Sequence, residues 1–266
     1  SYARKGEFSE NVYGDGGRCM KKRRIFRNLN DKEFAWVLYD VGNSAYTMLA
    51  CALIPIWFKA MAIGTKPGQL TSDRATAYYS MAIAVITIVV ALLGPVCGAI
   101  SDYKGMKKIF FTSTVAVGVC GCILNGFACQ WIVFLLLFAA TKIFYNMSLM
   151  FYDSMLNDIT TEERMDEVSS YGYAWGYLGS CIPFLIALVA YVLGPDMAGI
   201  ISGKLSMAIG FAVTGLWWLL VTVPLIKNYK QINYVEKKEH AVGSAFRRIF
   251  ETIRFIATKD KKVFFF

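Results

Sequence analysis

Two charged residues lie well inside apolar stretches of this sequence, away from their ends, and these stretches are long enough to cross a membrane. Asp40 falls in the first such stretch and Lys142 in the fourth. A charge in the hydrocarbon core of a bilayer is costly, so each must face protein or water, and each marks a candidate binding site. Helical spacing places neutral hydrogen-bonding groups on or beside the same helix faces. These neighbours are Asn43 and Tyr46 for Asp40, and Tyr145 and Asn146 for Lys142.

Bond-making chemistry at these positions lacks the usual side chains. The sequence holds one histidine, His240, in a polar stretch, so no histidine base or metal ligand falls within an apolar span. The seven cysteines are spread over apolar segments, and Cys120 and Cys122 do not have the C-x-x-C spacing of a redox or zinc site. We therefore expect no enzyme activity, no cofactor and no metal.

The elements that must position these residues are transmembrane helices. Hydrophobic residues make up 56% of the chain and charged residues 18%, whereas a soluble domain has about a quarter of its residues charged. The composition predicts an all-α integral membrane protein with six spanning helices, because each span needs about 20 apolar residues. The spans are expected at about 34–58, 75–101, 109–128, 131–155, 169–193 and 205–226.

The charge distribution predicts how the spans are oriented. The net charge of +9 comes from basic residues in tails and loops beside apolar spans, a pattern that favours membrane orientation over nucleic-acid binding. Of the 28 lysines and arginines, only three are expected in outer loops, namely Lys66, Arg74 and Lys204, so the distribution follows the positive-inside rule. We expect a multi-pass protein with its N-terminus in the cytoplasm.

Composition divides the chain into four parts. Residues 1–30 are expected to form a disordered, basic, cytoplasmic N-terminus, and residues 31–228 the six-helix transmembrane bundle. Residues 229–258 read as a cytoplasmic loop whose apolar residues recur at helical spacing, which predicts an amphipathic helix on the membrane surface or against a partner. Residues 259–266 resemble the start of a seventh span.

A short charged turn separates the second and third spans. Gly98 is expected to let the second span approach a neighbour closely, and Gly105 to permit a tight reversal. Asp102 places a carboxylate at the helix exit, while Lys107 and Lys108 anchor the start of the next helix. Its lysines predict that this turn is cytoplasmic.

The fifth span begins with a glycine-rich run. Gly172, Gly176 and Gly179 recur at spacings that let another helix pack backbone to backbone. We interpret them as helix-packing residues rather than ligands.

The turn resembles the loop between helices 2 and 3 of the major facilitator superfamily. The residues that match its glycine, apolar, carboxylate, glycine and basic positions are Gly98, Ile100, Asp102, Gly105 and Lys107. Tyr103 and Met106 stand where the superfamily usually has arginines, so any cation network built by those arginines is weakened or rerouted here. The run at 36–46, WVLYDVGNSAY, together with the glycine-rich fifth span and the Asp102-Tyr103 form of the turn, is similar to the vacuole-effluxer branch of that superfamily.

This resemblance implies the N-terminal half of a secondary transporter, with a six-helix bundle, that moves a small solute such as an amino acid by alternating access. Its partners would be the lipid bilayer, the solute, a coupling proton or cation, and the missing C-terminal half, which the hinge carboxylate Asp102 would engage. The membrane would be the bacterial plasma membrane, or the vacuolar membrane in a eukaryote. The alternatives are a non-transporting multi-span scaffold and a truncated, inactive half-transporter.

Asp40 and Lys142 are expected at similar depths in the membrane, counted along their helices at about 1.5 Å per residue. A direct ion pair between them is one hypothesis, because pairing lowers the cost of holding each charge. The alternatives are separate solvation by water, or pairing of Lys142 with a carboxylate of the missing half.

Overall fold

The computed structural model describes residues 28–195 and 197–235, and these ranges form six long helices without a β-strand. All six are long and apolar enough to span a membrane, which confirms the predicted fold class. A 3-10 turn, η2 (Glu162–Arg164), precedes the fifth helix. The helices are α1 (Asp31–Ala62), α2 (Ser72–Ser101), α3 (Met106–Asn125), α4 (Trp131–Ile159), α5 (Met165–Val192) and α6 (Gly203–Asn228).

Most of the helices begin before the apolar stretches that predict them, because polar residues form their first turns. At α1 the Asn30 side chain accepts hydrogen bonds from the backbone N–H groups of Lys32 and Glu33, at 2.9 and 2.8 Å. The Glu33 carboxylate in turn accepts from the Asn30 N–H at 2.8 Å. This reciprocal cap satisfies free N–H groups at the helix start, so α1 begins at Asp31, before its apolar residues.

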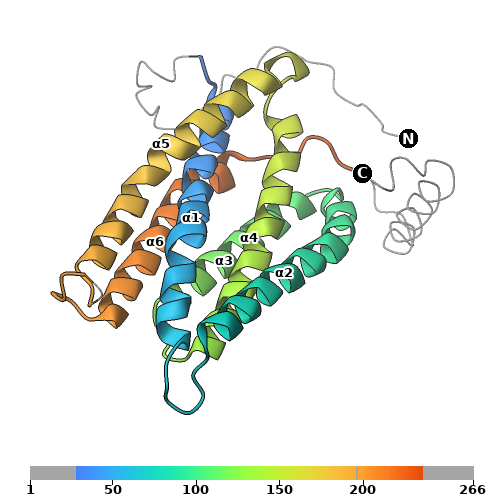
Figure 1. Cartoon of the computed structure of the whole chain (residues 1–266). Helices are drawn as coiled ribbons and strands as arrows, with labels where there is room; N and C mark the ends of the chain where they lie inside the picture. The colour runs from blue at the N-terminus through green and yellow to red at the C-terminus, as the bar shows by residue number, and fades with distance from the viewer. Residues whose placement is uncertain (1–27, 196, 236–266) are drawn as a thin grey trace, which may run out of the picture.

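Helix α1 lies at the centre of the bundle. It packs against α5, α6 and α4, while α3 packs against α4 and α6, and α2 against α4 (Figure 1). The largest fully buried side chains include Tyr39 and Tyr46 of α1 and Trp218 of α6. The most polar of the spanning helices is therefore also the one most enclosed by protein.

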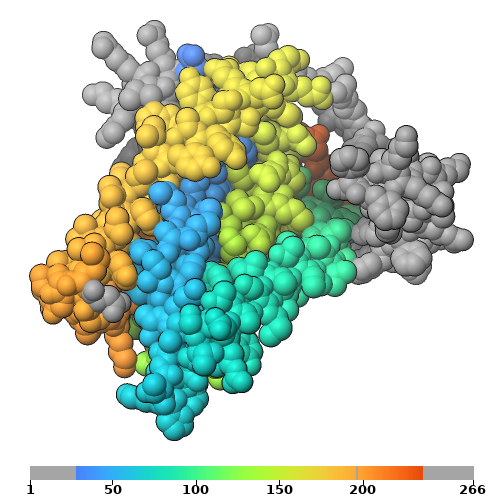
Figure 2. Space-filling model, in the orientation of Figure 1, coloured from blue at the N-terminus to red at the C-terminus, as the bar shows by residue number. Residues whose placement is uncertain are grey.

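Helix α2 has the opposite environment. Its buried residues are Ala75, Ile86, Gly94 and Ser101, and its large apolar side chains are mostly exposed. Figure 2 shows a face on which α1 and α4 lie in the middle, flanked by α5 and α2. An apolar surface of this extent is stable in lipid or against another apolar protein surface, and it accords with a membrane protein.

Three of the predicted segments lie outside the described residues. They are most of the basic N-terminus within 1–30, the amphipathic helix within 229–258, and the seventh-span start at 259–266.

Candidate functional site

Asp40 and Asn43 lie one helical turn apart on α1, as their spacing predicts. The Asn43 Nδ2 donates a hydrogen bond to Asp40 Oδ1 at 3.1 Å. Asn43 is buried, and Asp40 is partly exposed. One carboxylate oxygen of Asp40 is thus held by a neutral neighbour, and the negative charge has no cationic partner in the described part of the chain.

Lys142 of α4 lies over two tyrosine rings. Its Nζ is 4.6 Å from the centroid of the Tyr145 ring and 5.7 Å from that of Tyr46. Rings attract a cation through their electron-rich faces, so this contact holds the ammonium without neutralising it. The Tyr145 hydroxyl is hydrogen-bonded to Thr47 Oγ1 at 2.5 Å, which ties α4 to the polar face of α1. Asn146 lies one residue further on and is partly exposed.

Asp40 and Lys142 do not form an ion pair among the residues that the structure describes. Asp40 is held by Asn43 and lies against α5, whereas Lys142 rests on tyrosine rings. The direct ion pair between Asp40 and Lys142, one of the arrangements that the sequence left open, is therefore not formed in this structure. Each charge keeps capacity for a partner, because the lysine ammonium has three donors and the carboxylate has about four acceptor positions.

The fifth-helix glycines lie against α1 at the level of Asp40. A Cβ added to Gly172 or Gly176 would lie 3.2 or 3.1 Å from Asp40 Oδ2, and one added to Gly179 would lie 2.4 Å from Val41 Cγ1. Side chains at these positions would push α5 away from α1. The glycines therefore allow the close approach of the two helices, and two of them border the carboxylate directly.

Aromatic side chains form the surroundings of Asp40 on the α4 side. Trp36 stacks on Tyr152 with centroids 4.3 Å apart, and its Nε1 donates to the Tyr152 carbonyl at 3.1 Å. The hydroxyls of Tyr46 and Tyr152 are buried and make no hydrogen bond within the described residues. Buried hydroxyls normally have partners, so these two are available to a ligand or to water.

The second group of predicted residues lies in and beside the turn between α2 and α3. Gly105 has φ 77°, a left-handed conformation that favours glycine, and it allows the tight reversal. Gly98 lies within α2, and a Cβ there would meet nothing within 4 Å. Among the described residues, no neighbour makes the close approach expected at Gly98. Lys108 is bound to the end of α6, where its Nζ donates to the Tyr229 carbonyl at 3.4 Å.

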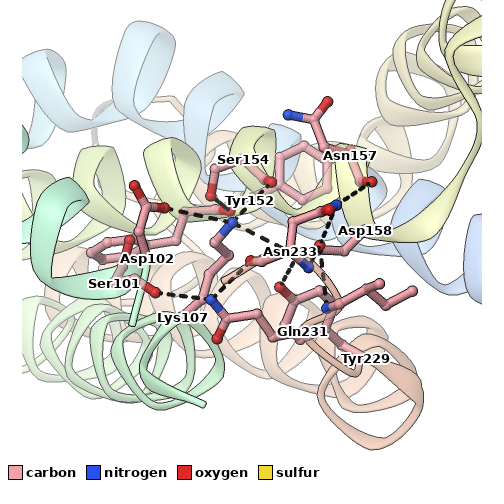
Figure 3. Close-up of polar contacts among 12 residues, drawn as sticks. Ser101, Asp102, Lys107, Tyr152, Ser154, Asn157, Asp158, Tyr229, Gln231 and Asn233 are labelled. Carbon is pink, nitrogen blue, oxygen red and sulfur yellow. Dashed lines mark hydrogen bonds and ion pairs between the residues drawn. The ribbon is translucent and has the colours of Figure 1, made fainter. Parts of the chain in front are cut away.

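Lys107 is the cation at the centre of this turn. Its side chain is 6% exposed, and its Nζ lies 3.7 Å from Asp158 Oδ2 and 3.9 Å from Asp102 Oδ1 (Figure 3). It also donates to the Ser154 carbonyl at 3.3 Å. The hinge carboxylate Asp102, expected to engage the missing C-terminal half, thus lies within ion-pair distance of Lys107 in this bundle. Burial raises the pKa of Asp102 and Asp158 raises it further, while the Lys107 charge lowers it.

Two functional residues at this end of the bundle were missed by the sequence reasoning. The Glu33 side chain is 2% exposed and receives Arg164 at both oxygens, at 3.1 and 3.0 Å. Thr160 also donates to it at 2.8 Å, so the start of α1 is fastened to the α4–α5 connection. The Asn30-x-x-Glu33 capping pattern was a usable signal for Glu33, but Arg164 lies 131 residues away and has no local signal.

These observations define a multi-pass helical membrane protein with unpaired charges held inside the bundle and with the turn between α2 and α3 tied to the ends of α4 and α6. Residues 30–266 match the model of the family described as vacuole effluxer Atg22 like, and the chain belongs to that family. Over 233 residues it is 34% identical to the uncharacterized MFS-type transporter YxiO of Bacillus subtilis (strain 168). That match covers 86% of this chain and 54% of the relative, so the chain spans about half the length of this curated relative. The family resemblance predicted from residues 36–46 and from the turn is confirmed.

Proposed function

We propose that this chain is the N-terminal half of a secondary transporter that moves a small solute, with amino acids as the solute class, by alternating access. The observation that carries the proposal is the pair of unpaired charges, Asp40 on α1 and Lys142 on α4, within one helical bundle. Unpaired charges inside a membrane protein lower its stability, so they are retained for what they bind.

The two charges suit the two ends of an amino acid. The Lys142 ammonium offers three donors to a carboxylate, and Asp40 offers acceptors to an ammonium group or to a coupling proton or cation. The neutral groups of Asn43, Tyr46, Tyr145 and Asn146 would complete the hydrogen bonds of a bound solute. The other wall of the site belongs, in this proposal, to the C-terminal half, and the N-terminus lies in the cytoplasm.

Uptake by the whole transporter in lipid vesicles tests the proposal. Vesicles are loaded with a pool of amino acids, and exchange with the same pool carrying radiolabel is measured for the parent and for Asp40→Asn and Lys142→Met. We expect each substitution to lower exchange at least about tenfold, because each removes a charge-assisted hydrogen bond worth about 1.5–3 kcal/mol. Asp73→Asn, at an exposed position in the first turn of α2, is the matched control.

Two results would count against the proposal. If vesicles with the parent protein exchange no amino acid faster than empty vesicles, amino acids are not the transported solute. Full exchange by both Asp40→Asn and Lys142→Met would remove these residues from the site. This chain alone is expected not to transport, since it supplies one wall of the site.

A further inference from the structure

The segment that follows α6 packs against the turn between α2 and α3. We call residues 229–235 the strap. It runs from the end of α6 to the turn between α2 and α3 (Figure 1), and its contacts join that turn to the end of α4 (Figure 3). Val235 forms an isolated parallel bridge with Tyr103, in the middle of the turn. The strap is therefore the first part of the connection that leaves the bundle.

One side of the strap is held by Asp158, in the last turn of α4. This carboxylate is fully buried, and it accepts hydrogen bonds from the Tyr229 hydroxyl at 2.6 Å and the Asn233 backbone N–H at 2.7 Å. The Asn233 Nδ2 donates to it at 2.9 Å, and the Ile232 N–H at 3.3 Å. Burial, followed by the bond to Asp158, raises the pKa of Tyr229, so the phenol keeps the proton that it donates. Most donors to this buried charge come from the strap.

The other side of the strap is held by the backbone of the turn. Gln231 accepts from the Gly105 N–H at 2.9 Å and donates to the Ser101 carbonyl at 3.2 Å. The Val235 N–H donates to the Asp102 carbonyl at 2.8 Å. The last carbonyls of a helix have no partner within the helix, so the strap satisfies groups at the end of α2 that water would otherwise hold.

The contacts of the strap are suited to release. Tyr229 is its one large side chain buried to 2% exposure, whereas Ile232 and Tyr234 are 58% and 44% exposed. A segment held by polar contacts with little buried apolar area opens at lower free energy than the core does. The groups that it would leave behind lie at the ends of α2 and α4 and in the turn, where water can replace the lost hydrogen bonds.

We propose that the strap is a releasable lock, and that Asp158 is the positioning residue that docks it on the turn. The proposal rests on the proposed function, because the strap would be the start of the connection to the second half. With the strap docked, that connection and the ends of α2, α3 and α4 form one body. A rearrangement of the turn during transport then requires the strap to leave Asp158.

Docking is tested first, without any transport measurement. Amide hydrogen exchange of a peptide covering 229–235 is compared between the parent and two variants, Asp158→Asn and Asn233→Ala. Asp158→Asn removes the charge that the strap donors share, and Asn233→Ala removes one donor from an exposed position without altering the buried carboxylate. We expect exchange to rise at least about tenfold in Asp158→Asn and by a smaller factor in Asn233→Ala. Tyr234→Phe, which keeps the ring near Lys104, is the matched control and should match the parent.

Release is tested by fastening the strap. Tyr103→Cys with Val235→Cys joins the two bridge partners by a disulfide in a whole transporter whose native cysteines have been replaced. Bridge partners lie about 5 Å apart at Cα, a separation that a disulfide tolerates. We expect the oxidised protein to lose at least about nine-tenths of its exchange activity and to regain it on reduction, because reversal separates a lock from damage to the fold.

Each outcome decides one claim. Unchanged amide exchange in Asp158→Asn would overturn docking through that residue, and full activity of the disulfide-linked protein would overturn release. The reduced protein reports on the proposed function by itself. If it fails to transport, the proposed function fails, and the exchange comparison still decides whether Asp158 docks the strap.

Discussion

The turn between α2 and α3 and the face of α1 and α4 that carries Asp40 and Lys142, here called the α1/α4 face, hold their charges in opposite ways. At the turn, Lys107 lies between two carboxylates, and Asp158 is surrounded by donors. On the α1/α4 face, Asp40 is held by one neutral side chain and Lys142 by two rings. The charges of the first region are satisfied by the protein, and those of the second are not.

The difference indicates which charges maintain the structure and which are kept for a ligand. A buried charge surrounded by donors becomes costly when one partner is removed, because the remaining group is left uncompensated. A buried charge without a partner already carries that cost, so its removal should be tolerated or even stabilising. The same kind of substitution should therefore have opposite consequences in the two regions.

The largest effect is expected for Lys107→Met at the turn. This change leaves the buried Asp158 without its cation, and it should lower the free energy of unfolding by about 3 kcal/mol. Equilibrium unfolding by sodium dodecyl sulfate in mixed micelles measures it. Lys108→Met is the control, since its 3.4 Å bond to a carbonyl is long and should contribute less than about 1 kcal/mol. Equal free energies of unfolding for Lys107→Met and Lys108→Met would show that the buried ion pair of Lys107 stabilises the protein no more than the long hydrogen bond of Lys108 does.

The second largest loss in the free energy of unfolding is expected for Gly179→Ala. This variant tests whether close packing of α5 holds α1 in place near Asp40. The new methyl would lie 2.4 Å from Val41 Cγ1, so α5 must move away, at a cost of about 1–3 kcal/mol. Gly98→Ala is the matched control, because its methyl meets open space. The same micelle titration should show a loss for the first and none for the second. A loss at Gly98 would mean that an undescribed partner packs there.

The fold was predictable because the length of each apolar stretch is a local signal. The six spans were recovered to within a few residues, and the deviations occur where caps matter. Helix α1 begins at Asp31 because Asn30 and Glu33 cap it, although its apolar residues begin later. Helix α3 ends at Asn125, before the apolar residues Phe127 and Ala128 that extended the predicted span.

The site was predictable in part. Asp40 and Lys142 stand out because a charge in an apolar stretch is costly, whereas their actual neighbours depend on how α1, α4 and α5 pack. The sequence motif identified the turn, but it did not identify Asp158, the main hydrogen-bond acceptor beside it. Asp158 and Asn233 are 75 residues apart, and no local pattern connects them. The same reason explains why the ion pair between Glu33 and Arg164 was missed.

A smaller effect is expected for Asp40→Asn and Lys142→Met on the α1/α4 face. Neither change removes an ion pair among the described residues, so each should alter the free energy of unfolding by less than about 1 kcal/mol, or raise it. Mixed-micelle unfolding beside Lys107→Met gives the direct comparison. If either variant loses as much stability as Lys107→Met, the two regions do not differ as proposed, and Asp40 or Lys142 has a structural partner.

The smallest effect is expected from Asp102→Asn, measured as a function of pH. Burial raises the pKa of Asp102, with Asp158 raising it further and Lys107 opposing the shift. A carboxyl group with a raised pKa in the folded state contributes stability below its unfolded pKa of about 3.9, and this contribution is lost as the pH rises through the folded value. The variant lacks this titration, so its stability relative to the parent should increase from about pH 4 towards pH 7. Because the side chain is 50% exposed, solvent screening should keep the change below about 1 kcal/mol. Unfolding titrations of both proteins at several pH values measure the difference, and parallel curves would show that Lys107 offsets the burial of Asp102 completely.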